Sequence, residues 1–106
     1  MMKGHDFIME IEVKKGEGTL EIRPVGRIDT KSSPQLEDLL KASLDGVKLL
    51  TFDFEKVEYI SSAGLRVLLM SQKTMNRQGD MKLKNVNKDI MEIFRVTGFS
   101  EILTIE

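Results

Sequence analysis

Apolar and polar residues alternate twice in the first quarter of the chain. Residues 7–13 and 19–25 place apolar side chains at every second position, a period typical of strands that bury one face. The polar segment 14–18 contains two glycines and separates the two runs, so together they predict an antiparallel hairpin. Pro24 has no N–H to donate, which predicts a sheet edge or a bulge at its position. Residues 26–30 should then leave the hairpin as a loop.

Beyond the hairpin, helix-like runs alternate with strand-like runs. Three helices are predicted, over residues 32–46, 62–79 and 87–98, because each begins with a capping residue, continues at helical spacing and stops at a glycine. Residues 47–54 and 81–86 predict two further strands. The predicted core positions of the helices are Leu36, Leu39, Leu40, Leu44, Leu65, Leu68, Leu69, Met75, Ile90, Ile93 and Phe94.

This order predicts a single α/β domain over residues 1–106, with a mixed, mostly parallel sheet, an opening hairpin, and helices packed against the sheet. Right-handed crossovers make the second, third and fourth strands parallel, so their carboxyl ends meet at one edge. Residues 27–30, 53–62 and 85–87 come together there, where open α/β sheets usually place functional groups. Residues 99–105 form a last apolar segment of unassigned type.

The composition excludes several classes of function. With a net charge of −1 and basic residues spread along the chain, no face for nucleic acid is predicted. The absence of cysteine excludes disulfides, thiolate catalysis and cysteine-bound zinc, and His5 is the single histidine, so no metal site and no cofactor are expected. No apolar run approaches the ~20 residues that cross a membrane, and residues 1–6 lack a signal-peptide pattern. A cytoplasmic protein is expected.

Ser61 and Ser62 stand between a strand-like run and a helix-like run. A serine nucleophile needs a general base, but His5 lies far away in the sequence and no Gly-x-Ser-x-Gly motif occurs. We therefore predict no catalytic residue and no enzyme. Ser62 is predicted instead to cap the following helix. The free N–H groups of that helix would also tolerate a phosphate on Ser62, so modification should affect a docked partner more than the fold.

Asp53 and Asp29 follow strands at the predicted edge. Asp53 allows a less favoured interpretation, an aspartyl-phosphate receiver in which this carboxylate accepts a phosphate. That chemistry needs further acidic residues for Mg²⁺ and a lysine on a later loop, but Asp29 stands alone and no lysine follows Asp89. The simpler interpretation is that both aspartates accept hydrogen bonds from backbone N–H groups of their loops.

Arg66, Met70, Lys73 and Arg77 fall on one stripe of the helix that is predicted to start at Ser62. Charged residues in such a stripe usually form a solvated face. The stripe would also suit an acidic partner surface, because it is cationic and includes an apolar methionine. Spacing alone favours the solvated face.

Residues 60–69, Ile-Ser-Ser-Ala-Gly-Leu-Arg-Val-Leu-Leu, resemble the signature of the STAS domain, which sulfate transporters share with bacterial anti-sigma factor antagonists. Residues 26–29, 50–54 and 96–99 also resemble segments of that family, so the resemblance covers essentially the whole chain. The short length favours the stand-alone antagonists. The resemblance implies a STAS-like domain and a non-catalytic protein that regulates sigma-factor-dependent transcription.

The resemblance also implies a phosphorylation site and partners. In stand-alone antagonists the serine that follows an aspartate is phosphorylated, and by position that serine is Ser62, with Ser61 as the alternative. Ser61 occupies the place of the usual aspartate, and Ala63 a place that often carries a hydroxyl. The implied partners are a serine-kinase anti-sigma factor, which uses ATP, and a metal-dependent serine phosphatase. Phosphorylation of the antagonist would release the anti-sigma factor, and the phosphatase would remove the phosphate. The residues expected to bind the partner are Asp29, Ser61, Ser62, Ala63, Gly64, Arg66, Met70 and Lys73.

The resemblance leaves an alternative function open. The chain would then be a STAS interaction or scaffold module that is never phosphorylated and that serves a larger regulatory or transport assembly.

Overall fold

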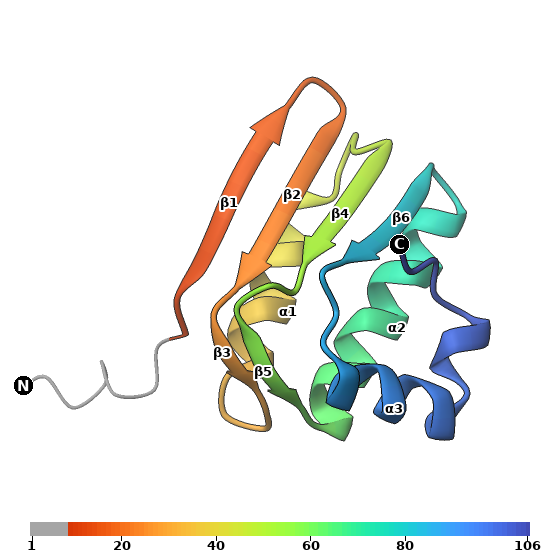
Figure 1. The fold of residues 1–106 in the computed structure, drawn as a ribbon. Helices are drawn as coiled ribbons and strands as arrows, with labels where there is room; N and C mark the ends of the chain where they lie inside the picture. The colour runs from red at the N-terminus through yellow and green to blue at the C-terminus, as the bar shows by residue number, and fades with distance from the viewer. Residues whose placement is uncertain (1–8) are drawn as a thin grey trace, which may run out of the picture.

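The computed structural model describes residues 9–106, which contain a four-stranded sheet with one face covered by helices (Figure 1). β1 (Ile11–Gly16) pairs antiparallel with β2 (Thr19–Pro24), which pairs in parallel with β4 (Leu49–Asp53). β4 in turn pairs in parallel with β6 (Asp80–Lys84), so the strand order is β1-β2-β4-β6. The predicted hairpin and the parallel arrangement of β2, β4 and β6 are confirmed.

The turn of the hairpin is tighter than predicted. Residues 14–16, expected in the turn, continue β1 up to its pairing with Thr19, which leaves residues 17–18 to reverse the chain. The prediction failed because β1 is an edge strand whose side chains are exposed beyond its first residue, so polar residues there do not mark a turn. Residues 7–8 of the predicted strand, and His5, lie outside the described residues.

A second, two-stranded sheet joins the carboxyl end of the first. It pairs β3 (Gly26–Ile28) in parallel with β5 (Val57–Ile60). The predicted loop over residues 26–30 is therefore wrong for its first part, and β5 was not predicted, because three and four residues are too few for a periodic pattern. Pro24 is the last residue of β2 and lies beyond the residues that pair with β4, so its missing N–H interrupts no ladder between them.

Two long helices, α1 (Ser33–Ser43) and α2 (Ser62–Asn76), lie on one face of the four-stranded sheet (Figure 1). α3 (Lys88–Thr97) follows β6 and packs against β5, and a short 3-10 helix, η2 (Phe99–Glu101), follows it. The unassigned C-terminal segment thus contains one helical turn, and its Ile105 then forms a single parallel bridge with β6. No helix within residues 9–106 is long and apolar enough to cross a membrane.

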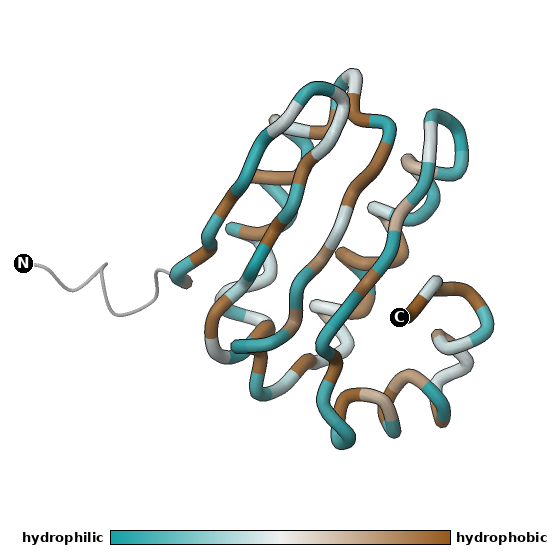
Figure 2. The backbone as a smooth tube through the Cα atoms, turned by 45° about the horizontal axis from the view of Figure 1, so that its top comes forward, coloured by the Kyte–Doolittle hydropathy of each residue, from teal (hydrophilic) through white to brown (hydrophobic). Residues whose placement is uncertain are grey.

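The core lies between the sheet and its helices. Hydrophobic residues recur along β2 and β4 and along the helices (Figure 2). The largest fully buried side chains are Phe52, Phe54, Phe94, Leu20, Ile22, Ile28, Leu36, Leu40, Leu50, Ile60, Leu68 and Met75. Among the predicted helical core positions, Leu39, Leu69 and Ile93 are only half-buried, because they lie at the rims of their apolar stripes.

Two predicted helix ends of α3 are confirmed. The side-chain oxygen of Asn87 accepts the N–H of Ile90 at 2.8 Å and so caps the first turn. Gly98 ends the helix with a φ of 84°, a left-handed conformation that favours glycine.

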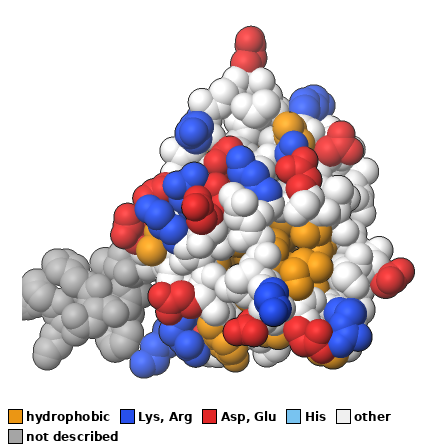
Figure 3. Space-filling model, in the orientation of Figure 1, with side chains coloured by type: hydrophobic (Ala, Val, Ile, Leu, Met, Phe, Trp, Pro, Cys, Tyr) orange, Lys and Arg blue, Asp and Glu red, His pale blue; other side chains and the backbone are white. Residues whose placement is uncertain are grey.

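The other face of the four-stranded sheet is open and carries interspersed charges of both signs (Figure 3). A guanidinium nitrogen of Arg23 lies 3.6 Å from a carboxylate oxygen of Glu12, and the ammonium nitrogen of Lys84 lies 3.9 Å from a carboxylate oxygen of Glu21. Acidic and basic side chains therefore compensate one another on this face.

Candidate functional site

Asp53 ties together the carboxyl ends of the parallel strands, at the predicted edge. Its carboxylate accepts hydrogen bonds from the Arg23 guanidinium at 2.9 Å, the Asn85 side-chain amide at 2.9 Å and the Glu55 backbone N–H at 3.0 Å. The residue is only 1% exposed. These bonds connect β2, β4 and the loop after β6, so Asp53 holds loops together, as the simpler interpretation predicted. Both of its oxygens already accept hydrogen bonds, and neither is free to accept the phosphate of a receiver.

The hydrogen bonds of Asp53 also determine its protonation. Burial by itself would raise the pKa of this carboxyl group. The bonds from Asn85, the Glu55 N–H and Arg23 outweigh burial and hold the pKa of Asp53 below its ordinary value. Asp53 is therefore charged throughout the physiological range.

Acid should weaken the fold through Asp53. A carboxyl group whose pKa is lower in the folded chain stabilises the fold fully above its unfolded pKa, near 3.8, and this contribution is lost as the pH falls through the folded pKa. We expect denaturant midpoints to be flat near neutral pH and to fall below about pH 4. Asp53→Asn should be less stable at pH 7 but less sensitive to acid, and parallel pH profiles for the two proteins would contradict this role.

Asp29 organises the loop between β3 and α1. Its carboxylate accepts the backbone N–H groups of Lys31 at 3.0 Å and Ser32 at 3.1 Å, and the Ser32 hydroxyl donates to the carbonyl of Arg27 at 2.7 Å. The Ser32 N–H is the main reason that the pKa of Asp29 is lowered. Here too the loop-tying interpretation describes the geometry.

The first turn of α2 begins directly beside β3. The N–H of Ser61 donates to the carbonyl of Ile28 at 2.8 Å, and the carbonyl of Ser61 accepts the N–H of Leu65 at 2.9 Å. Ser61 therefore occupies the N-cap position, and Ser62 is the first residue of the helix. The prediction that Ser62 caps α2 is wrong by one residue, because β5 continues to Ile60 and leaves only Ser61 between strand and helix.

The two neighbouring hydroxyls differ in accessibility. The oxygen of Ser61 is buried and has no hydrogen-bond partner, so it does not cap the free N–H groups of the first turn. The side chain of Ser62 is exposed. Of the two, only Ser62 presents its hydroxyl to solvent beside those N–H groups.

Gly64 allows α2 to approach the second sheet. A Cβ atom at this position would lie 2.6 Å from Cγ1 of Ile60 and 2.7 Å from Cγ2 of Ile28, both of which are too close. The residue is buried, so its contribution is to set the position of the exposed Ser62 relative to β3 and β5.

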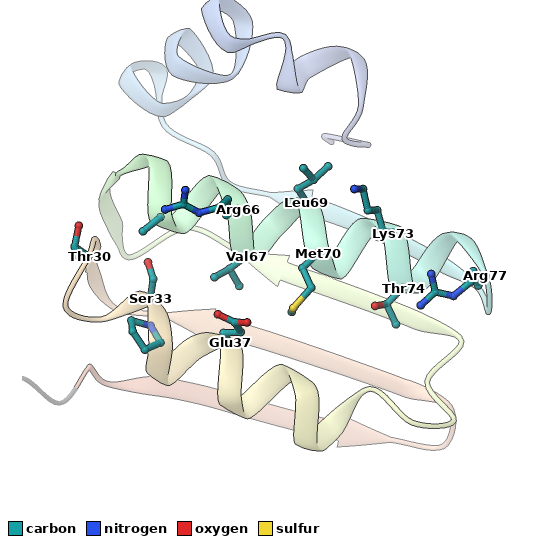
Figure 4. Close-up of a pocket in the computed structure, with 12 residues that line it drawn as sticks. Thr30, Ser33, Glu37, Arg66, Val67, Leu69, Met70, Lys73, Thr74 and Arg77 are labelled. Carbon is teal, nitrogen blue, oxygen red and sulfur yellow. The ribbon is translucent and has the colours of Figure 1, made fainter.

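A groove of about 650 Å³ runs between α1 and α2 (Figure 4). Val67 and Met70 of α2 point toward α1, while Lys73 points away from it. Met70 lies on the stripe for which spacing favoured a solvated face, but it is half-buried. Ala63 and Arg66 line the end of the groove nearest Ser62.

The structure thus divides the predicted partner-binding residues into two groups. Asp29 and the segment 61–64 follow β3 and β5 at the carboxyl end of the two-stranded sheet, whereas Met70 and Lys73 lie further along α2. The sequence did not indicate that Ser33 and Glu37 of α1 line the same groove. Apolar spacing identifies the buried stripe of a helix, but it does not say which helix lies beside it.

Comparison with known proteins places this geometry in a family. The family model of the STAS domain matches residues 10–106. The chain belongs to the STAS domain family. It is 32% identical over 99 residues to BtrV of Bordetella bronchiseptica, a protein described as an anti-sigma factor antagonist, with 92% of this chain and 85% of BtrV covered. It is 29% identical over 98 residues to the anti-sigma-B factor antagonist of Bacillus subtilis, with 92% of this chain and 90% of that antagonist covered.

The fold agrees with that assignment. The anti-sigma factor antagonist SpoIIAA in its unphosphorylated form superposes with a TM-score of 0.72 and 17% identity, over 92% of this chain and 86% of SpoIIAA. The phosphorylated form of SpoIIAA, from Bacillus, superposes with a TM-score of 0.73 and 17% identity, over 92% of this chain and 91% of SpoIIAA. The predicted STAS-like α/β fold is confirmed. Anti-sigma factor antagonists of this family are regulatory proteins without catalysis, in agreement with the prediction of no enzyme.

Proposed function

We propose that this STAS chain is an anti-sigma factor antagonist, which docks on a serine-kinase anti-sigma factor through the carboxyl end of its two-stranded sheet and is released when Ser62 is phosphorylated. The observation that carries the proposal is the exposed hydroxyl of Ser62 on the first residue of α2. The relatives described as anti-sigma factor antagonists, which align along 92% of the chain, support the choice of partner.

Accessibility supports Ser62 over Ser61 as the modified residue. A kinase must bring its ATP to the serine oxygen, and the oxygen of Ser61 is buried between β5 and α2. The oxygen of Ser62 can be reached without opening the helix. Ser61 stands where the family usually has an aspartate, so the kinase would have to recognise Ser62 without that charge.

The fold should tolerate a phosphate on Ser62. The first three N–H groups of α2 have no partner within the helix, and an anion at a helix N-terminus stabilises it by about 0.3–1 kcal/mol. Arg66 lies one turn further along, at a spacing that allows it to pair with the phosphate. SpoIIAA supports this view, because its phosphorylated and unphosphorylated forms resemble this chain equally well.

The docked interface should not tolerate the same phosphate. A charge placed in a contact surface without a partner of opposite sign costs about 2–5 kcal/mol, which weakens binding by a factor of roughly thirty to several thousand. Phosphorylation would therefore act as a release signal. A metal-dependent serine phosphatase would restore the binding form, and the cycle would run in the cytoplasm, where ATP and sigma factors are found.

The second candidate is a STAS module that is never phosphorylated. The absence of an aspartate at position 61 favours it, because a kinase specific for this family would lose one recognition feature. In that case the same end of the two-stranded sheet would hold a scaffold partner constitutively.

The proposal is tested by competition. The purified chain should bind at least one serine-kinase anti-sigma factor of its source and displace the cognate sigma factor, as followed by size-exclusion chromatography or calorimetry in the presence of ADP. Addition of ATP should reverse the displacement. Failure to bind any of these kinases would refute the proposal, and binding that ATP leaves unchanged would favour the unphosphorylated module.

A further inference from the structure

The groove between α1 and α2 extends beyond the predicted partner-binding surface. It begins beside Ala63, one residue after Ser62, and follows α2 to Arg77 at the end of the helix. A second hollow of about 340 Å³ shares Met70 and Thr74 with it and continues to Gln78. Because α2 has 15 residues, the two together follow about 22 Å of helix.

The charge of this groove differs from that of the chain as a whole. Arg66, Lys73 and Arg77 lie along its α2 rim, where Lys73 is directed away from α1 (Figure 4). All three are exposed, and none of them forms an ion pair within residues 9–106. The carboxylate of Glu37 lies on the α1 side, where Lys41 pairs with it at 3.0 Å. The whole chain carries a net charge of −1, and the open sheet face has compensated charges. The α2 side of the groove thus carries three exposed cations without an ion pair.

A buried hydroxyl also points into the groove. Ser33 is only 3% exposed, and its oxygen has no hydrogen-bond partner. Its side chain is directed toward α2 at the end of the groove nearest Ser62 (Figure 4). Because this oxygen is buried, as that of Ser61 is, Ser33 shapes this end of the groove and offers no free hydroxyl to a ligand.

The floor of the groove is apolar. Val67 is 3% exposed, and Met70 is half-buried between the two helices. An amphipathic helix that lies between two others buries its apolar side on such a floor and leaves its polar sides at the rims. With cations along one rim, the complementary helix is acidic.

We propose that this groove binds an acidic amphipathic helix of the anti-sigma factor partner, which continues the contact from Ser62 along α2. The inference rests on the proposed function, since that supplies the partner. A second copy of this chain fits less well, because a two-fold contact would bring the same cations of both copies together. A phosphate on Ser62 would then disturb only one end of an extended interface.

Removal of two charges tests the groove. Lys73→Gln with Arg77→Gln keeps residues that favour helices and removes the cations furthest from Ser62. We expect the Kd for the anti-sigma factor to rise roughly tenfold or more, and its dependence on salt to become weaker. The matched control, Lys14→Gln with Lys15→Gln, removes the same charge from β1 and should change the Kd less than about twofold.

A photocrosslinker at Thr74, inside the groove, identifies the occupant directly. We expect it to capture a peptide of the anti-sigma factor that is rich in aspartate and glutamate. An unchanged Kd for the groove variant, or capture of a second copy of this chain, would overturn the inference while leaving the proposed function in place. Failure of the unmodified chain to bind any serine-kinase anti-sigma factor would overturn both.

Discussion

Replacement of Ser62 by aspartate is expected to weaken the complex with the anti-sigma factor roughly a hundredfold or more. The exposed side chain stands at the start of α2, where a carboxylate faces free N–H groups and fits the helix dipole. The melting temperature should therefore stay within about 3 °C of the unmodified chain. Calorimetric titration with the anti-sigma factor and a thermal melt measure the two quantities separately.

Ser62→Asn is the matched control, because asparagine has nearly the shape of aspartate without its charge. It should bind within roughly fivefold of the unmodified chain, since only a small change of contact remains. Equal losses for the two variants would show that size and not charge breaks the complex. Undiminished binding of Ser62→Asp would remove the release mechanism.

Replacement of Gly79 by alanine is expected to cause the largest loss of stability, about 3 kcal/mol. A Cβ atom there would lie 2.1 Å from the carbonyl oxygen of Lys48 and 2.7 Å from its carbonyl carbon. These are backbone atoms that cannot rotate away, and the same carbonyl accepts the N–H of Asp80 at 2.8 Å. For a domain of this size the melting temperature should fall by about 15 °C.

Gly98→Ala separates a steric clash from backbone strain. Gly98 has a φ of 84°, but no atom lies within 4 Å of the Cβ that alanine would add, so only the strain of about 1 kcal/mol applies. Equal destabilisation by the two variants would mean that β6 shifts freely against the loop before β4, contrary to the packing described here.

The sequence predicted the parts of the fold that have a long period or a strong local signal. The hairpin, the parallel strands and α3 with its Asn87 cap are of this kind. β3 and β5 could not be predicted, because strands so short are defined by their pairing with each other and not by a local pattern. This omission also misplaced the cap of α2, since a strand that ends at Ile60 makes Ser61 the N-cap residue.

The candidate site was predictable to a similar extent. The alternation of strands and helices places Asp29, Asp53 and Ser62 at one edge, but the structure separates them: Asp53 ends β4 of the four-stranded sheet, whereas Asp29 and Ser62 follow β3 and β5 of the second sheet. The burial of the Ser61 oxygen and the contribution of Ser33 to the groove depend on how α2 lies against β3 and α1. Such contacts between elements that are distant in sequence leave no periodic signal.

Phosphorylation of the intact chain tests the central claim most directly. The protein, Ser62→Ala and Ser61→Ala are each incubated with ATP and a serine-kinase anti-sigma factor that binds the chain, and their intact masses are measured. We expect the addition of one phosphoryl group, stable to acid, to the unmodified chain and to Ser61→Ala, and none to Ser62→Ala. A phosphoryl group on Ser62→Ala, or no mass gain in the unmodified chain with any such kinase, would contradict this claim.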